Sequence, residues 1–299
     1  MWLKDDFDVE VAYSRPHHNV FECPHTHYFS SVADMNNIVT NVDPDIIHVH
    51  NTPDWPTISI RKITDYPIIH DIHDFTSDWG TLREACRLSD YIVTVNSDMA
   101  RDLSNVISRD VQVYHTTPPR KVTQLLKLSE GDGKPHTVFI GSFHYEQVAR
   151  NSAEAMSRTF KTLKMPIHIH SNFFRSILKE YENDYFILED EIPFADVPTV
   201  LSQYDLGIAL PFDTVDSNLS YNYTHMLPSK MFDYWQAGIP TICDGRYATM
   251  STFIDTNEIG ISYTHLSRKV IEKAVKTDIN TAFQPLTVRD CEPYRGLIE

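Results

Sequence analysis

The sequence predicts an α/β protein built from two Rossmann-like domains, and three observations favour this class. The chain has 299 residues, about twice the ~150 residues of an average domain. Short runs of contiguous β-branched residues alternate with helix-length segments, which is typical of parallel sheets covered on both faces. Turn-forming residues bracket a segment near the middle of the chain, at 116–120 and 129–135, which indicates a domain boundary there. A hydrophobic share of 41% excludes wholesale disorder.

The first series of elements occupies the N-terminal half. Contiguous rather than alternating apolar residues in most of its strands predict a buried parallel sheet. Ser97 is expected to cap the last helix of the series. The expected strands are 8–13, 45–49, 67–70, 91–95 and 111–114, and the expected helices are 31–41, 55–64, 78–89 and 97–107.

A second alternating series follows the break. Its expected strands are 137–140, 167–170, 185–188, 206–210 and 240–243, and its expected helices are 146–162, 174–181, 197–203 and 229–237. The sequence is therefore divided into a first domain over 1–118, a linker over 119–135, a second domain over 136–280, and a tail over 281–299 that is expected to return to the first domain. Because ligands bind at the carboxyl ends of parallel strands, we expect the two sheets to share a cleft there.

Composition excludes several classes of protein. A net charge of −15 disfavours nucleic acid and anionic membranes as partners. There are 9 glycines and the first is Gly80, so a glycine-rich phosphate loop after the first strand is excluded. The four cysteines form no CxxC pair, which argues against a zinc cluster or a disulfide scaffold. With no apolar run near 20 residues and no secretory signal, we expect a cytoplasmic protein.

The most informative segment is 227–243, LPSKMFDYWQAGIPTIC. Pro228 and Ser229 are typical of a helix N-terminus, and Gly238 closes the same helix. Lys230 lies in the first turn, where the helix dipole disfavours a cation. An anionic ligand explains this lysine better than solvent exposure does, and the exposed N–H groups of a helix start favour a diphosphate.

This segment resembles the nucleotide-binding region of GT-B glycosyltransferases, in particular the retaining family 4, in which Pro-Ser-Lys, an aromatic and acidic pair and Ala-Gly-x-Pro precede a strand. Residues 194–211 resemble the helix, the aspartate on a strand and the proline loop that come before it in that family. In the N-terminal half, residues 44–51, 68–74 and 89–97 resemble the strand ends that line the acceptor side.

The resemblance implies an enzyme that transfers a sugar from a UDP- or GDP-sugar to a glycan, lipid or protein acceptor. Retention, no metal and no other cofactor are implied with it, and a homo-oligomer is one expected arrangement. By the resemblance, Ser229 and Lys230 contact the donor diphosphate and Asp233 contacts the ribose. The complete donor-binding set it implies is Gly141, Ser142, Arg150, Ser229, Lys230 and Asp233.

On the acceptor side, the resemblance makes His73 and Asp74 the catalytic residues. It makes His48, His50 and His225 contacts of the acceptor or the sugar. The family has two glutamates eight residues apart, where this chain has His225 and Asp233. This departure leaves an alternative open, a degenerate GT-B protein that binds a nucleotide or a partner without catalysis.

Histidines supply a further alternative. The ends of two neighbouring predicted strands carry His48, His50, His70, Asp71, His73 and Asp74. A metal-dependent hydrolase would need three or more of them to converge, whereas hydrogen-bonded histidines or sugar contacts would not. The sequence leaves these three interpretations open.

The first 79 residues contain no glycine, although family members open with a strand and a glycine-rich turn. Either the first strand–helix unit is missing or residues 17–27 replace it. We therefore expect a shortened N-terminal domain, with an unusual acceptor or one completed by another chain.

Overall fold

A computed structural model of the chain describes residues 7–14, 25–50, 53–75, 78–115, 120–141, 143, 146–171, 173–209, 221–287, 290–292 and 294–295. The chain divides into two units. Unit 1 consists of Met1–Pro118 and Leu286–Glu299, and unit 2 consists of Pro119–Pro285.

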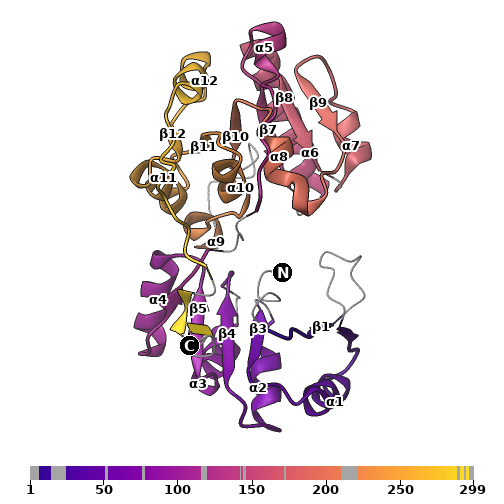
Figure 1. The fold of residues 1–299 in the computed structure, drawn as a ribbon, viewed down its shortest axis with the longest axis vertical. Helices are drawn as coiled ribbons and strands as arrows, with labels where there is room; N and C mark the ends of the chain where they lie inside the picture. The colour runs from indigo at the N-terminus through magenta and orange to yellow at the C-terminus, as the bar shows by residue number, and fades with distance from the viewer. Residues whose placement is uncertain are drawn as a thin grey trace. The chain divides into compact units, whose positions relative to one another are not determined.

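Unit 1 contains a four-stranded parallel sheet in the order β3-β4-β5-β6 and a separate parallel pair, β1-β2 (Figure 1). Its elements are β1 (Val11–Tyr13), β2 (Thr26–Tyr28), α1 (Val32–Val42), β3 (Ile47–His50), α2 (Trp55–Arg61), β4 (Ile68–Ile72), α3 (Trp79–Leu88), β5 (Tyr91–Thr94), α4 (Ser97–Ile107) and β6 (Gln112–Val113). Every strand and helix expected in this half is present, with ends shifted by a few residues. Strand β2 was not predicted, because the segment has no run of apolar residues.

The two faces of the four-stranded sheet are covered differently. Successive strand residues point to opposite faces, and Ile68 packs in one cluster with Ile60 of α2. Its neighbour Ile69 packs in another cluster with Cys291 and Tyr294 from the end of the chain. Crossovers in one direction place α2, α3 and α4 on the same face, so the C-terminal segment covers part of the other.

Unit 2 contains a six-stranded parallel sheet in the order β12-β11-β10-β7-β8-β9. Its elements are α5 (Ser129–Asp132), β7 (Thr137–Ile140), α6 (Glu146–Leu163), β8 (Ile167–His170), α7 (Arg175–Lys179), β9 (Phe186–Glu189), η2 (Phe194–Asp196), α8 (Val197–Leu201), β10 (Leu206–Ile208), α9 (Tyr221–His225), α10 (Lys230–Gln236), β11 (Thr241–Asp244), α11 (Ala248–Thr256), β12 (Gly260–Tyr263) and α12 (Arg268–Val275). The strand order reverses between β7 and β10, as in a doubly wound sheet.

Helices cover both faces of the sheet of unit 2, and α6 lies on one of them. Its fully buried residues Ala149, Ala153, Met156 and Phe160 recur at helical spacing, which places them on one stripe. The stripe packs with strand residues such as Ile167 in one large apolar cluster. On the other face, Val138 of β7 packs with Leu201 of α8 and Tyr234 of α10, so the contiguous apolar strands of the sequence have helices on each side.

Two sequence expectations need correction or completion. Ser97 is not the N-cap of α4. Asn96 takes that place, and its side chain accepts a hydrogen bond from the Met99 N–H at 2.9 Å. The elements after residue 244, namely α11, β12 and α12, were not predicted, since their apolar residues are interrupted by polar ones.

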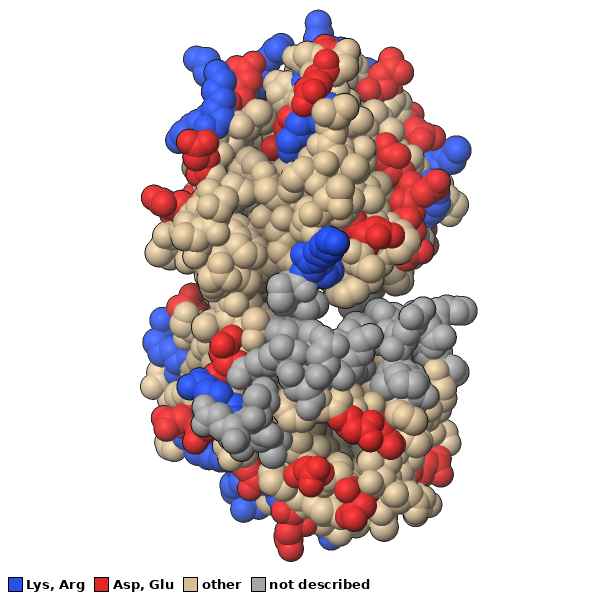
Figure 2. All heavy atoms as spheres, viewed as in Figure 1, with Lys and Arg blue, Asp and Glu red and all other residues tan. Residues whose placement is uncertain are grey.

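On the face shown in Figure 2, basic side chains of the described residues are interspersed with acidic ones instead of forming one continuous patch. Within the part of the chain that the structure describes, no helix has the length and apolar character that a membrane span requires.

Candidate functional site

A pocket of about 380 Å³ lies in unit 2 at the carboxyl ends of β7, β8 and β9. Gly141, Ser229, Lys230 and Asp233 all line it, so the structure brings together four of the six residues that the resemblance assigned to the donor. The pocket lies next to the reversal of strand order, where ligands of doubly wound sheets bind. Residues that the sequence analysis did not single out complete its wall, chiefly His170, Ser171, Phe173, Glu191 and Ile192.

The other two donor-binding residues of the sequence analysis lie elsewhere. Ser142 is outside the described residues. Arg150 is on α6, where its guanidinium pairs with Glu146 at 3.3 Å and with Glu180 at 3.0 Å, and it does not line the pocket. Its role in donor binding stays a prediction.

Tyr234 fixes helix α10 over the sheet and so positions the lysine. Its hydroxyl donates to the Ile208 carbonyl at 3.0 Å and accepts from the Ile140 N–H at 3.2 Å. The ring passes so close to β10 that a Cβ at Gly207 would lie 2.3 Å from it, which is closer than atoms can approach. A glycine in the strand is therefore needed for α10 to approach it.

Lys230 lies in the first turn of α10 against the end of β7. Its Nζ lies 5.2 Å from the centre of the Phe139 ring, and a Cβ at Gly141 would lie 3.1 Å from Lys230 Cε. Gly141 also has φ +124°, a backbone conformation that favours glycine. Burial lowers the pKa of Lys230 to about 8, while the Asp233 carboxylate opposes that change. The lysine is thus a cation that is held in the pocket without full hydration.

Asp233 is buried, and its partner is a residue that the sequence placed in the linker. The Arg120 guanidinium donates to Asp233 Oδ1 and, at 3.0 Å, to the Phe194 carbonyl. Burial raises the pKa of Asp233, and the positive charges of Arg120 and Lys230 hold part of that rise back. No motif marks Arg120 in the sequence. It supplies a second cation beside the pocket through its contact with Asp233.

His170 faces the same pocket in its neutral form. Its Nδ1 lies 2.6 Å from the Asp190 carbonyl, which can only accept a hydrogen bond, so Nδ1 carries the proton. Nε2 therefore accepts from the Tyr204 hydroxyl at 2.9 Å. Burial lowers the pKa of His170, which keeps positive charge at this end of the pocket on Lys230.

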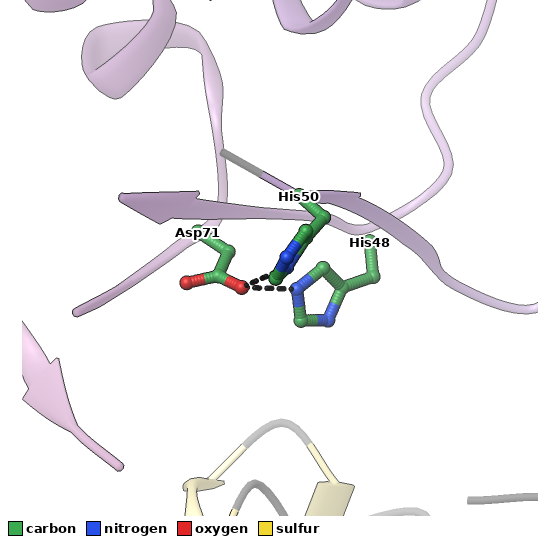
Figure 3. Close-up of side chains that lie close together, drawn as sticks. All are labelled: His48, His50 and Asp71. Atoms are coloured by element: carbon green, nitrogen blue, oxygen red, sulfur yellow. Dashed lines mark hydrogen bonds and ion pairs between the residues drawn. The ribbon is translucent and has the colours of Figure 1, made fainter. Parts of the chain in front are cut away.

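Unit 1 gathers a second set of polar side chains at the ends of β3 and β4. His48 and His50 are two residues apart on β3, and the register pairs His50 with Asp71. Both imidazoles point toward one oxygen of Asp71 (Figure 3). The distances to Asp71 Oδ2 are 3.0 Å from His48 Nε2 and 2.7 Å from His50 Nδ1.

Two further donors converge on the same oxygen. His73 Nε2 lies 3.1 Å from Asp71 Oδ2, and the Tyr114 hydroxyl donates to it at 2.5 Å. Burial raises the pKa of Asp71, but the histidines outweigh it and hold that pKa well below its usual range. Burial and the same carboxylate hold the pKa of Tyr114 well above its usual value. For His50, partial desolvation of the ring lowers the pKa, yet the hydrogen bond to Asp71 leaves it above the ordinary value.

Three of the predicted residues lie away from this cluster. His70 points to the opposite face of the sheet, where Nδ1 lies 2.9 Å from Thr57 Oγ1 on α2. Asp74 is exposed just after the strand. His225 ends α9 in unit 2, with Nδ1 at 2.8 Å from Thr224 Oγ1, and it does not line the pocket. The roles given to Asp74 and His225 stay predictions.

Comparisons with known proteins identify the fold. Residues 4–118 match the family model described as Glycosyltransferase Family 4. TarM of S. aureus, solved with fondaparinux, α-GlcNAc-glycerol and UDP, is 10% identical over 84% of this chain and 52% of its own, with a TM-score of 0.56. The lipopolysaccharide outer core galactosyltransferase WaaB is 13% identical over 84% and 72%, with a TM-score of 0.52. The pneumococcal O-GlcNAc transferase GtfA, solved with UDP and GlcNAc, is 11% identical over 82% and 51%, with a TM-score of 0.53.

The fold is therefore that of the GT-B glycosyltransferases, as the sequence predicted. The match of residues 4–118 to the Glycosyltransferase Family 4 model confirms the predicted resemblance. No curated protein sequence matches the chain. The chain spans about half the length of TarM and GtfA.

Proposed function

We propose that the chain transfers a sugar from a nucleotide-sugar donor, with a UDP-sugar favoured, to an acceptor hydroxyl. The observation that carries this proposal is the pocket of unit 2, which is lined by Gly141, Ser229, Lys230 and Asp233. The complexes of TarM and GtfA with UDP support the choice of nucleotide. We further propose retention of configuration at the anomeric carbon.

The donor diphosphate is proposed to bind beside Lys230. In its charged form this ammonium offers up to three hydrogen-bond donors, and its charge is worth more to an anion because the pocket is partly shielded from water. Asp233 is proposed to accept from a ribose hydroxyl through the oxygen that Arg120 does not hold. In this arrangement, the positive charge of Lys230 stabilises the negative charge of the leaving diphosphate, so no metal ion is needed at the donor.

The acceptor is proposed to contact unit 1, with His73 as the catalytic residue nearest the transferred sugar. The hydrogen bond to Asp71 orients its imidazole, and an oriented imidazole can position an acceptor hydroxyl or share developing charge. Asp74, His48, His50 and, in unit 2, His225 are proposed contacts of the sugar or acceptor. The acceptor is a glycan, a lipid or a protein.

Isothermal titration of the protein with UDP, GDP and a panel of their sugars tests the donor site. We expect saturable binding of at least one UDP-sugar, and about tenfold or greater weakening in Lys230→Ala, since a charge-assisted contact contributes about 1.5–3 kcal/mol. Lys161→Ala is the matched control, because Lys161 is exposed on α6 of the same unit. Absence of binding by every nucleotide, or equal affinity in Lys230→Ala, would refute the proposal.

The degenerate alternative rests on one observation. Asp233, which replaces the second glutamate, already has one carboxylate oxygen held by Arg120, while His225 replaces the first. Nucleotide binding with neither donor hydrolysis nor transfer to any acceptor in a glycan and lipid panel would support this alternative. Formation of a glycosylated product would exclude it.

A further inference from the structure

We propose that His48, His50 and Asp71 form a site in unit 1 that binds one divalent metal ion such as Zn²⁺, Co²⁺ or Ni²⁺. Each residue offers one ligand atom, and these three atoms all lie within 4.8 Å of one another (Figure 3). The site uses residues of unit 1 alone and needs no nucleotide, so ion binding can be tested apart from the donor site of unit 2. His48 and His50 are also proposed contacts of the sugar or acceptor, so an ion bound here would lie among those contacts.

The geometry fits an ion after small movements. Ligand atoms around a tetrahedral zinc with bonds of about 2.0–2.1 Å lie about 3.3 Å apart. Asp71 Oδ2 is 2.7 Å from His50 Nδ1 and 3.0 Å from His48 Nε2. These two distances need shifts of a few tenths of an ångström, and the third, between the two histidine nitrogens, is no longer than 4.8 Å, so rotation of the two imidazole rings can admit the ion. Two histidines with one carboxylate are an established ligand set for such metals.

The hydrogen bonds around Asp71 are hard to satisfy without an ion. His48, His50 and the Tyr114 hydroxyl all lie within 3.0 Å of Oδ2, although a carboxylate oxygen has about two lone-pair directions. His73 Nε2 lies 3.1 Å from the same oxygen and 2.8 Å from the Tyr114 hydroxyl. The other oxygen, Oδ1, is buried and has no hydrogen-bond partner. If an ion binds His48 and His50, only His73 and Tyr114 remain, and the two oxygens of the carboxylate can share them.

The surroundings of His48 match those of a metal-bound histidine. Such a histidine usually has its second ring nitrogen hydrogen-bonded to a fixed group, which sets the ring orientation. His48 offers Nε2 to the ion, and its Nδ1 is hydrogen-bonded to the Tyr294 hydroxyl from the C-terminal segment. Tyr114 holds Asp71 in the same way.

Access and ligand type define the ion. The His50 side chain is 63% exposed, so an ion can enter from solvent, and three protein ligands leave at least one position for water or for an oxygen of a bound molecule. Two nitrogen ligands favour zinc, cobalt or nickel over magnesium and calcium, which prefer oxygen.

The test uses the full chain after dialysis against a chelator. Titration calorimetry with Zn²⁺ measures stoichiometry and affinity, and the visible absorption of added Co²⁺ reports the ligand field. His50→Ala removes a ligand from an exposed position, so folding, monitored by circular dichroism, is preserved. His27→Ala is the matched control, since His27 also pairs with a single carboxylate, Glu10, at 2.6 Å and has no third ligand in the described residues.

We expect one Zn²⁺ per chain for the wild type and for His27→Ala, and at least tenfold weaker binding, with an altered Co²⁺ spectrum, for His50→Ala. Mg²⁺ is expected not to compete. Absence of stoichiometric Zn²⁺ binding, unchanged affinity in His50→Ala, or competition by Mg²⁺ would overturn the proposal. UDP titrations of the same variants report separately on unit 2, so failure of the metal site is distinguishable from failure of the donor site.

Discussion

The two units contain parallel sheets of the same kind but use their strand ends differently. The sheet of unit 2 reverses its strand order between β7 and β10, while the order β3-β4-β5-β6 of unit 1 has no reversal. At the reversal, neighbouring chain crossovers diverge and leave a hollow, and the pocket with Gly141 and Lys230 lies beside it. In unit 1, histidines and tyrosines meet over one buried carboxylate at the corresponding strand ends.

The two sites also differ in how the negative charge of a buried carboxylate is balanced. In unit 2 a single guanidinium, Arg120, holds the carboxylate of Asp233, and Lys230 beside it remains available for an anion. In unit 1 four donors hold the carboxylate of Asp71. Unit 2 thus resembles a site for a negatively charged ligand, while unit 1 resembles a site for a cation or for hydroxyl groups.

The largest effect is expected from Gly260→Ala in unit 2. A Cβ there would lie 1.9 Å from the Thr241 carbonyl oxygen of the neighbouring strand, so β11 and β12 would have to separate. We expect destabilisation of unit 2 on the order of 4 kcal/mol, measured by chemical denaturation, together with loss of nucleotide binding. Metal binding by unit 1 should persist if the units are independent.

Gly131→Ala is the control for that substitution. No atom lies within 4 Å of a Cβ built at Gly131, so we expect a change in unfolding free energy within about 0.5 kcal/mol. Similar stabilities for the two variants would mean that the contact between β11 and β12 is not as close as described, and loss of metal binding in Gly260→Ala would contradict the independence of the units.

Next in size is Arg120→Ala. The variant leaves the buried Asp233 carboxylate without its guanidinium, and breaking a buried ion pair in this way costs about 3 kcal/mol. Tyr114→Phe in unit 1 removes only one of four donors to Asp71, so a loss of about 1 kcal/mol is expected. Denaturant titration of both variants measures the difference.

Adding Asp233→Asn to Arg120→Ala should recover part of the loss, since the unpaired charge disappears. Equal destabilisation by Arg120→Ala and Tyr114→Phe would contradict the contrast between a carboxylate held by one guanidinium and a carboxylate held by several donors. A double variant no more stable than Arg120→Ala would contradict it as well.

A third prediction concerns the pH dependence of donor binding. Burial lowers the pKa of Lys230 to about 8, so the side chain is charged below that pH and loses its charge as the pH rises through it. The donor diphosphate keeps its charge over this range. The diphosphate of a UDP-sugar has no free terminal phosphate, so we expect the dissociation constant of the UDP-sugar to rise about tenfold between pH 7 and pH 9. Titration calorimetry measures it, with Lys230→Met as a control that should show no such dependence.

Much of the architecture could be predicted because apolar periodicity reports directly on buried strands and helices. The strands from β3 to β11 follow from runs of apolar residues, and the pocket residues Ser229, Lys230 and Asp233 follow from one motif whose spacing fixes a helix start. Such signals are local in the sequence, so one sequence suffices to find them.

What could not be predicted depends on contacts between distant residues. Arg120 and Asp233 are 113 positions apart, and the sequence around Arg120 contains no motif that predicts this contact. The same holds for Tyr294, which contacts His48 from 246 positions away. His70 could not be separated from His73 without knowing which strand residues face α2. The N-cap of α4 was misassigned because Asn96 and Ser97 are both good caps, and only the extended backbone at Asn96, with φ −158°, decides between them.

The smallest effects are expected from the helix caps. Comparing the cap of α4 in unit 1 with the cap of α12 in unit 2 tests the assignment of Asn96 as an N-cap. Asn96 caps α4 in unit 1 with a 2.9 Å hydrogen bond to the Met99 N–H, whereas Ser267 caps α12 in unit 2 with a longer one of 3.4 Å to the Val270 N–H. Loss of a side-chain cap costs about 1 kcal/mol, so we expect that loss for Asn96→Ala and a smaller one for Ser267→Ala. Ser97→Ala, at an exposed position one residue into α4, should change the unfolding free energy by less than about 0.5 kcal/mol. A larger loss in Ser97→Ala than in Asn96→Ala, measured by urea denaturation, would restore Ser97 as the cap, because only the true cap supplies a hydrogen bond that the helix cannot make for itself.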